Sequence, residues 1–163
     1  MRKDGSPMLV SLTRWGRIAV MALAVAFVTP VAAQPAATAD MAANKALVLA
    51  FWRNVFDAQD WTKAKDYLSE DYIQHNPNIA SGLKGFTDYF SKLWPAPKPA
   101  GSVAETQFVA VLAEGDLVQL MMRRPRPEPA DATKTYDSYW FDLFRVKDGK
   151  IVEHWDSALK PVK

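Results

Sequence analysis

The chain has 163 residues, about the size of one domain, and it contains no cysteine. Disulfides, thiol chemistry and cysteine-ligated metals are therefore excluded, and the fold must be held together by its hydrophobic core. The formal net charge is +2. Because lysine and arginine are not gathered into a basic domain, we expect no nucleic-acid partner.

Segment 1–33 has the features of a secretory signal peptide. Arg14 and Arg17 precede the apolar run Ile18–Val28, and small residues follow up to Ala33. This order is typical of an export signal cut after Ala33. The run is shorter than the roughly 20 apolar residues of a membrane span, although an uncleaved anchor is the alternative. We expect an exported protein, periplasmic or secreted, without membrane association once the signal is removed.

Removal of 1–33 changes the charge balance. It takes away four basic and one acidic side chain and leaves 16 basic and 17 acidic ones, so the basic character belongs mostly to the signal. The Ala/Pro-rich segment 34–43 is expected to be a flexible linker, and the domain to span 44–163. Its one basic cluster, from Arg123 to Arg126, is interpreted as part of a solvated, proline-rich loop.

Three helices are predicted in the first half of this domain. Apolar residues recur at helical spacing over 47–56, which indicates an amphipathic helix. A second, short helix is expected to begin at Asp60 and a third at Ser81, both of which are good capping residues. Between them, Tyr72–His75 is expected to be extended, because the proline that follows disfavours helical backbone before it.

From Ser102 onward the apolar period changes from 3.6 to 2, which predicts strands. Two strands are joined near Glu114–Asp116 and two more by Lys147–Lys150, where Asp-Gly is a strong hairpin signal. Three helices followed by four long antiparallel strands indicate an α+β fold, a conical curved antiparallel sheet packed against three N-terminal helices. Such a cone encloses an apolar hollow with few polar groups, which is typical of a small-molecule site.

Polar side chains on the last two strands are the first candidates for function. Alternation puts Val152, His154 and Asp156 on one face of the last strand, although which face is concave stays open. A carboxylate among aromatic side chains is a stronger base than a solvated one, so Asp156 is a candidate general base. The alternative is a strand-end residue that bonds to the backbone or to His154.

Four stretches, covering nearly all of 44–158, follow a known order and spacing: "NKALVLAFWRNVFDAQDW", "YIQHNPNIASGLKGFTDYF", "VLAEGDLV" and "FDLFRVKDGKIVEHWD". The most specific pieces are "YIQHNP" and "DGKIVEHWD". With these, the chain resembles the SnoaL-like polyketide cyclase branch of the nuclear transport factor 2-like superfamily. The resemblance implies a conical sheet closed by helices, a deep pocket, a homodimer through the outer sheet face, and any catalysis without metal or cofactor.

The resemblance also implies roles for single residues. In true cyclases of this family a pocket aspartate on a late strand is the acid/base of an intramolecular aldol closure, and Asp156 matches it. His75 matches the family's pocket histidine, expected to donate to a carbonyl or enolate oxygen, or else it is a turn histidine. His154 is expected to orient Asp156 or to bind a substrate oxygen, with packing beside Trp155 as the alternative.

Tyr72, Trp140 and Met122 are expected to line the pocket, with plain core packing as the alternative for each. The set His75, His154 and Asp156 would suit iron or zinc if the three met in space. Because the family does not use metal, we expect neither metal nor cofactor.

Two functions remain open at this point. One is a cofactor-free enzyme that transfers a proton α to a carbonyl, giving aldol cyclisation or isomerisation of a polyketide-like or ketone substrate. The other is an exported, non-catalytic binding protein for an apolar small molecule. In both, the partner is a small, apolar, carbonyl-containing molecule. A third alternative makes the outer sheet face the functional surface, in a homodimer or a partner complex.

Overall fold

The computed structural model describes residues 38–161, which belong to one compact unit, Gln34–Lys163. The expected signal peptide, 1–33, lies outside the described residues. The first helix begins at Thr38, earlier than the expected start near Asn44, so the second part of the expected linker is helical. Among the described residues, no helix combines the length and the apolar character that a bilayer crossing requires.

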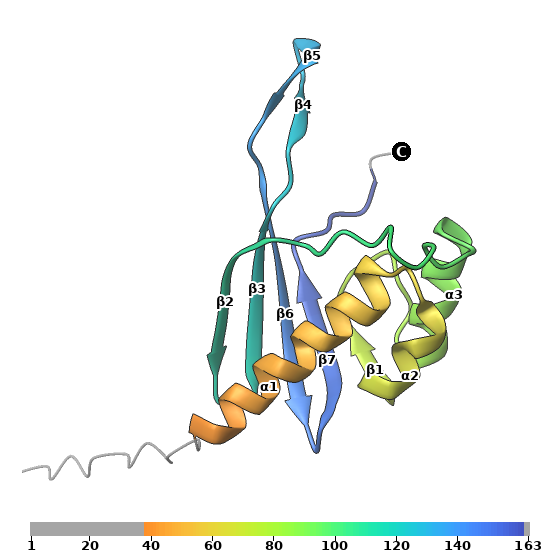
Figure 1. The fold of residues 1–163 in the computed structure, drawn as a ribbon, viewed down its shortest axis with the longest axis vertical. Coiled ribbons are helices and arrows are strands. Elements are labelled where there is room, and N and C mark those ends of the chain that lie inside the picture. Colours follow the sequence, from red (N-terminus) through yellow and green to blue (C-terminus); the bar gives the residue numbers. More distant parts are fainter. Residues whose placement is uncertain (1–37, 162–163) are drawn as a thin grey trace, which may run out of the picture. The chain divides into compact units, whose positions relative to one another are not determined.

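Three helical units precede the main strands, as the sequence predicts (Figure 1). Gly82, not Ser81, stands at the N-cap of the third, and the Ser81 hydroxyl instead accepts a hydrogen bond from the Gln74 backbone N–H. The first unit ends in a π-helical turn and the second begins with a 3₁₀ turn. The segments are α1 (Thr38–Phe51), η1 (Trp52–Asp57), η2 (Trp61–Lys63), α2 (Ala64–Tyr67) and α3 (Leu83–Leu93).

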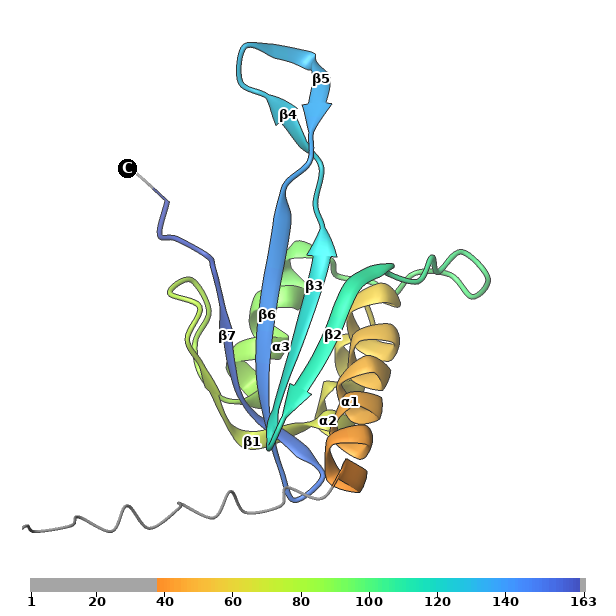
Figure 2. The ribbon, with the colours of Figure 1, turned by 90° about the vertical axis from the view of Figure 1, so that its left-hand side faces the viewer.

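Five strands form one sheet, in the order β1-β7-β6-β3-β2, and two more form a separate ribbon. Neighbours in the large sheet are antiparallel except β1 and β7, which pair in parallel. The helices cover one face of this sheet (Figure 2), so the α+β prediction is confirmed. The strands are β1 (Leu68–Gln74), β2 (Phe108–Glu114), β3 (Leu117–Arg123), β4 (Arg126–Glu128), β5 (Asp131–Tyr136), β6 (Tyr139–Lys147) and β7 (Lys150–Asp156).

Both predicted hairpins are present, and the second shows why its sequence is suited to the turn. Asp148 and Gly149 have φ angles of 50° and 72°. Positive φ at both central residues defines the turn whose twist matches that of paired strands, and Asp-Gly favours it. The proline-rich segment between β3 and β6, expected to be a loop, instead forms the β4–β5 ribbon, which continues beyond the ends of these strands (Figure 1).

A bulge in β7 decides which of its side chains face the helices. Ile151 pairs with Val146 and Glu153 with Arg145, so Val152 is the extra residue. A bulge resets the alternation of side chains. Ile151 and His154 are consequently both buried, although strict alternation would place them on opposite faces.

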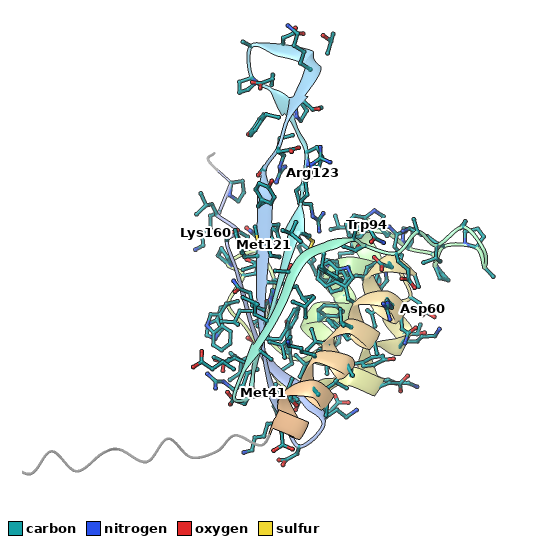
Figure 3. All side chains as sticks on the ribbon, turned by 60° about the vertical axis from the view of Figure 1, so that its left-hand side comes forward. Met41, Asp60, Trp94, Met121, Arg123 and Lys160 are labelled. Atoms are coloured by element: carbon teal, nitrogen blue, oxygen red, sulfur yellow. The ribbon has the colours of Figure 1, made fainter. Side chains whose placement is uncertain are left out.

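The core fills the space between the helices and the inner face of the sheet (Figure 3). Phe51 is fully buried and packs on Phe86 of α3 and Phe144 of β6. Asp57, an acidic residue at the end of η1, is also buried. Its carboxylate accepts hydrogen bonds from the Thr106 backbone N–H at 3.0 Å and from the Thr106 hydroxyl at 2.6 Å. These bonds tie the segment after α3 to the end of the first helical unit.

Candidate active site

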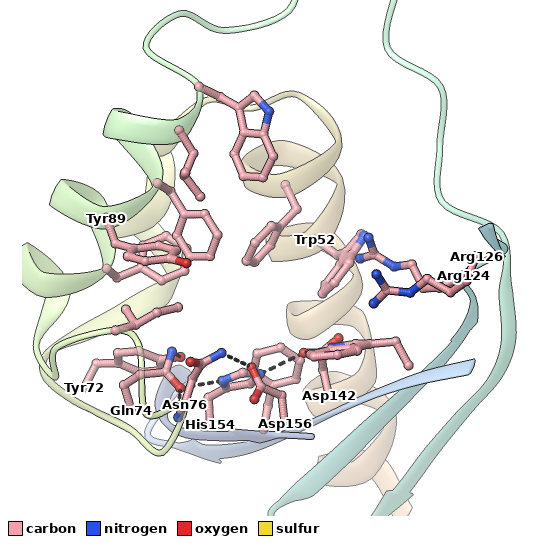
Figure 4. A pocket seen from close by; sticks show the side chains of 18 residues that line it. Trp52, Tyr72, Gln74, Asn76, Tyr89, Arg124, Arg126, Asp142, His154 and Asp156 are labelled. Atoms are coloured by element: carbon pink, nitrogen blue, oxygen red, sulfur yellow. Dashed lines mark hydrogen bonds and ion pairs between the residues drawn. The ribbon is translucent and has the colours of Figure 1, made fainter. Parts of the chain in front are cut away.

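A cavity of about 300 Å³ lies between the helices and the inner face of the sheet (Figure 4). Most of its wall is aromatic. Trp52 and Phe56 come from η1, Phe86 and Phe90 from α3, and Trp140 from β6. The polar side chains that line it are Tyr72, Gln74, Asn76, Tyr89, Arg124, Arg126, Asp142, His154 and Asp156. A small apolar hollow with a few placed polar groups is the usual form of a small-molecule site.

A buried chain of hydrogen bonds runs along the floor of the cavity. Gln74 Nε2 donates to Tyr72 Oη at 3.1 Å, and Gln74 Oε1 lies 2.8 Å from His154 Nδ1. The Asn76 backbone N–H also donates to Gln74 Oε1, at 2.9 Å. Since a backbone N–H can only donate, it fixes the orientation of the Gln74 amide. His154 Nδ1 must therefore carry a proton and donate it to Gln74.

His154 and Asp142 share one further proton. His154 Nε2 lies 3.0 Å from Asp142 Oδ1. With Nδ1 protonated, the pair is either an imidazolium bonded to a carboxylate or a neutral imidazole bonded to a carboxylic acid. In both forms a proton lies between Nε2 and Oδ1, and the Trp140 indole N–H donates to the same oxygen at 3.1 Å.

The second oxygen of Asp142 is in a different position. Asp142 Oδ2 is buried and has no hydrogen-bond partner among the described residues. A buried carboxylate oxygen without a protein partner is costly, so a water molecule or a bound ligand is the partner to expect. Because Asp142 lines the cavity, a bound molecule is a suitable partner for this oxygen.

Tyr72 provides a proton donor beside these groups. Burial, together with the negative charges of Asp142 and Asp156, holds the pKa of the Tyr72 phenol well above its usual value of 10. The phenol therefore keeps its proton at neutral pH. Because its oxygen already accepts from Gln74, its O–H is available to donate to another acceptor.

Asp156 lines the same cavity, and each of its two oxygens accepts one hydrogen bond. Oδ2 accepts a hydrogen bond from Asn76 Nδ2 at 2.6 Å, and Oδ1 accepts one from the Ala158 backbone N–H at 2.9 Å. The side chain is half-buried. The bond to the Ala158 backbone corresponds to the alternative of a strand-end residue that bonds to the backbone. The other bond instead orients the Asn76 side chain, which also lines the cavity.

His75 does not reach the cavity, so the expectation of a pocket histidine at this position is wrong. Its ring stacks on Trp155 at 4.9 Å, and Nε2 lies 2.7 Å from Glu153 on the outer face of the sheet. The reason is strand alternation, because Tyr72 and Gln74 of β1 point inward. The inward polar groups of this region are Gln74 and Asn76, which the sequence analysis did not select.

The three expected lining residues divide between cavity and core. Tyr72 and Trp140 line the cavity. Met122 is buried in the core and borders a second hollow, of about 550 Å³, on the other side of Trp52 and Phe56. Met122 and Trp140 are paired across β3 and β6, but Met122 lies outside the lining of the first cavity.

The expected metal-ligand set is also rearranged. His75 is on the outer face, while Asp142, His154 and Asp156 bring one ligand atom each to within 4.8 Å of one another. This donor set has the chemistry of a divalent-cation site. In the structure both ring nitrogens of His154 are engaged by Gln74 and Asp142, so a cation would have to replace the bond between His154 and Asp142. These hydrogen bonds by themselves account for the close approach of the three groups.

Comparison with known families agrees with this architecture. The model of the SnoaL-like domain matches residues 48–154, and the chain belongs to this family, within the nuclear transport factor 2-like superfamily. A search of curated proteins found no match. The matched range includes the hydrogen-bonded polar residues of the cavity floor but leaves out Asp156. The residues included are Tyr72, Gln74, Asn76, Asp142 and His154.

Solved structures share the fold at low sequence identity. A proposed SnoaL-like polyketide cyclase from Jannaschia sp. CCS1 is 19% identical, with 72% of this chain and 87% of that chain covered and a TM-score of 0.51. A proposed polyketide cyclase from Xanthomonas campestris pv. campestris is 18% identical, with 72% and 90% covered and a TM-score of 0.51. An LEH-like epoxide hydrolase of M. tuberculosis is 18% identical, with 72% and 83% covered and a TM-score of 0.50. These similarities concern the fold alone. Proteins with this fold are described both as proposed polyketide cyclases and as an epoxide hydrolase.

The outer-face ion pairs give a pH-dependent prediction. Glu153 is bonded to His75 at 2.7 Å and to Arg145 at 2.9 Å, and these groups lower its pKa from 4.5. A carboxyl whose pKa is lower in the folded state stabilises the fold above about pH 4.5 and loses this contribution as pH falls through the folded value. We expect Glu153→Gln to lower the free energy of unfolding by about 1 kcal/mol at pH 7 and by much less at pH 3.

Urea denaturation at the two pH values measures this difference. Glu114→Gln, at an exposed position, is the matched control and should leave stability unchanged at both. An equal loss for Glu153→Gln at pH 7 and pH 3 would contradict the assignment to ion pairing.

Proposed function

We propose that this protein transfers a proton at the carbon α to a carbonyl, with Asp142 as the general base and without a cofactor. The observation that carries the proposal is the buried, unpartnered oxygen Oδ2 of Asp142, a residue that lines an aromatic cavity. A general base needs an oxygen that is held in place and free to meet the proton, and it works best away from bulk water. Asp156, the base expected from the sequence, is only half-buried, and each of its oxygens already accepts a hydrogen bond.

The remaining floor residues fit the other half of the reaction. When Oδ2 takes the α-proton, the electron pair of the C–H bond forms the carbon–carbon double bond of an enolate, and negative charge develops on the carbonyl oxygen. The phenol of Tyr72, which burial keeps protonated, is a suitable donor to that oxygen. The hydrogen bond from His154 Nε2 to Oδ1 stabilises the negative charge of Asp142. Gln74 fixes the orientation of the His154 ring by accepting a hydrogen bond from Nδ1.

Two outcomes of the enolate balance without a further reactant. Where the enolate is conjugated with a further carbon–carbon double bond of the substrate, return of the proton from Asp142 to the γ carbon isomerises the substrate. Attack of the enolate carbon on a second carbonyl of the same molecule forms a carbon–carbon bond, and the resulting alkoxide takes the proton back from Asp142. The second outcome is an aldol closure, which forms a ring, and two of the similar structures are of proposed polyketide cyclases.

Deuterium exchange tests the shared first step. We expect the wild-type protein in D₂O to accelerate deuterium incorporation into 2-tetralone above the rate without protein. Asp142→Asn should reduce the protein-dependent rate by about 100-fold or more, because the amide cannot accept the proton. Asp156→Asn, a carboxylate of the same cavity, is the matched control and should retain most of the rate.

Other results would contradict the proposal in distinct ways. Equal exchange by the wild type and Asp142→Asn, with the ketone bound by both, would favour the non-catalytic binding protein. Loss of exchange in Asp156→Asn with retention in Asp142→Asn would return the role of base to Asp156.

A further inference from the structure

The cavity has opposite charges in separate places. Asp142 and Asp156 belong to its floor, together with His154 (Figure 4). Arg124 and Arg126 line the same cavity, and their guanidinium groups lie beside Trp52, away from the carboxylates. A bound molecule would therefore meet acidic and amide groups at one end and two positive charges at the other.

These two arginines lack the acidic partners that other arginines of the domain have. Within the described residues no carboxylate is within ion-pair distance of Arg124 or Arg126. The Arg124 guanidinium contacts Met122 Sδ at 3.3 Å, and a thioether sulfur is a weak acceptor. Arg123, by contrast, pairs with Asp137 at 2.6 Å, and Arg145 pairs with two carboxylates.

The backbone holds the pair in place, although Arg124 and Arg126 are both exposed, as the expected solvated segment would have them. The Arg124 N–H donates to the Ser138 carbonyl at 2.7 Å, beyond the end of β3. Arg126 begins β4, where it is paired with Tyr136. Pro125 between them restricts the backbone, and residues two apart in extended chain share a face. Arg124 and Arg126 therefore reach the cavity together.

We propose that the ligand of this cavity is an apolar keto acid whose carboxylate is bound by Arg124 and Arg126 and whose carbonyl lies at the Asp142 floor. The placement of the carbonyl at Asp142 rests on the proposed function. The placement of the carboxylate at the two arginines goes further, because it names the class of substrate. Guanidinium groups bind carboxylates through paired hydrogen bonds, and the aromatic wall formed by Trp52 and Phe56 suits the apolar body between the two ends. The floor carboxylates repel an anion, so the ligand has one favoured direction.

Binding of 2-naphthoate and of its neutral methyl ester tests this assignment, with calorimetry as the readout. We expect the wild type to bind the carboxylate at least about tenfold more tightly than the ester, since hydrogen bonds to charged groups contribute roughly 1.5–3 kcal/mol. Arg124→Gln/Arg126→Gln should remove this preference, because glutamine carries no charge to pair with the carboxylate. Arg123→Gln, adjacent in sequence but paired with Asp137, is the matched control and should keep it.

The outcomes separate this inference from the proposed function. Equal affinity of the wild type for the two probes, an absence of binding of both, or an equal loss in Arg123→Gln would overturn it. Asp142→Asn should retain the carboxylate preference even though it loses exchange. The exchange test uses the neutral 2-tetralone, which has no carboxylate for the arginines to bind, so that failure of the arginine assignment leaves the assignment of the base standing.

Discussion

Replacing Phe51 by alanine is expected to lower the free energy of unfolding by about 3–5 kcal/mol, the usual range for truncating a buried aromatic side chain. Phe51 is fully buried at the end of α1. Its ring lies 5.5 Å from that of Phe56 and 5.9 Å from those of Phe86 and Phe144, so it joins all the layers of the domain. The loss combines the lost burial with the cavity left behind, because neighbours from both helices and sheet cannot all move in.

Urea denaturation of the wild type, Phe51→Ala and Phe51→Leu measures this cost. Leucine refills most of the volume, so Phe51→Leu should be destabilised much less than Phe51→Ala. A loss below about 1 kcal/mol in Phe51→Ala would show that the helices and sheet do not share this contact.

His154→Leu is expected to destabilise the fold by a similar amount, about 3–5 kcal/mol at neutral pH. The leucine removes the partner of Asp142 Oδ1 and leaves a buried carboxylate with the Trp140 N–H as its remaining donor. It also leaves the Gln74 carbonyl oxygen without its bond to the ring. The cost is therefore mainly that of an uncompensated buried charge and not of lost packing.

A second substitution separates charge from packing. Asp142→Asn in the His154→Leu background removes the charge and changes the volume little, so it should recover roughly 1–3 kcal/mol of the loss in urea denaturation. If the double variant were no more stable than His154→Leu, the buried charge would not be the cause.

The sequence was sufficient to predict the elements whose cues are local. The apolar spacing over 47–56 fits only a helix, and Asp148-Gly149 fits only a tight hairpin turn. The structure has both. The position of the last strand's side chains could not be predicted in the same way. The bulge at Val152 depends on how β6 and β7 fit around the core, and no single residue marks it.

Part of the site was accessible to sequence reasoning and was missed. Alternation along Tyr72–His75 already places Tyr72 and His75 on opposite faces, so the two could not both line one cavity. Alternation also places Asp142 on the same strand face as Trp140, and a carboxylate on an inward face beside an aromatic side chain is unusual. The approach of Arg124 and Arg126 depends on the β4–β5 ribbon, which local patterns did not predict.

The account depends on the proton positions along Gln74, His154 and Asp142, and nitrogen-15 NMR of the His154 ring observes them directly. We expect Nδ1 to be protonated near neutral pH, with its proton held in a hydrogen bond and slow to exchange, and we expect the Nε2 signal to change in Asp142→Asn. An unprotonated Nδ1 would require the Gln74 amide to be reversed. The bond network that leaves Asp142 Oδ2 free for a substrate proton would then be wrong.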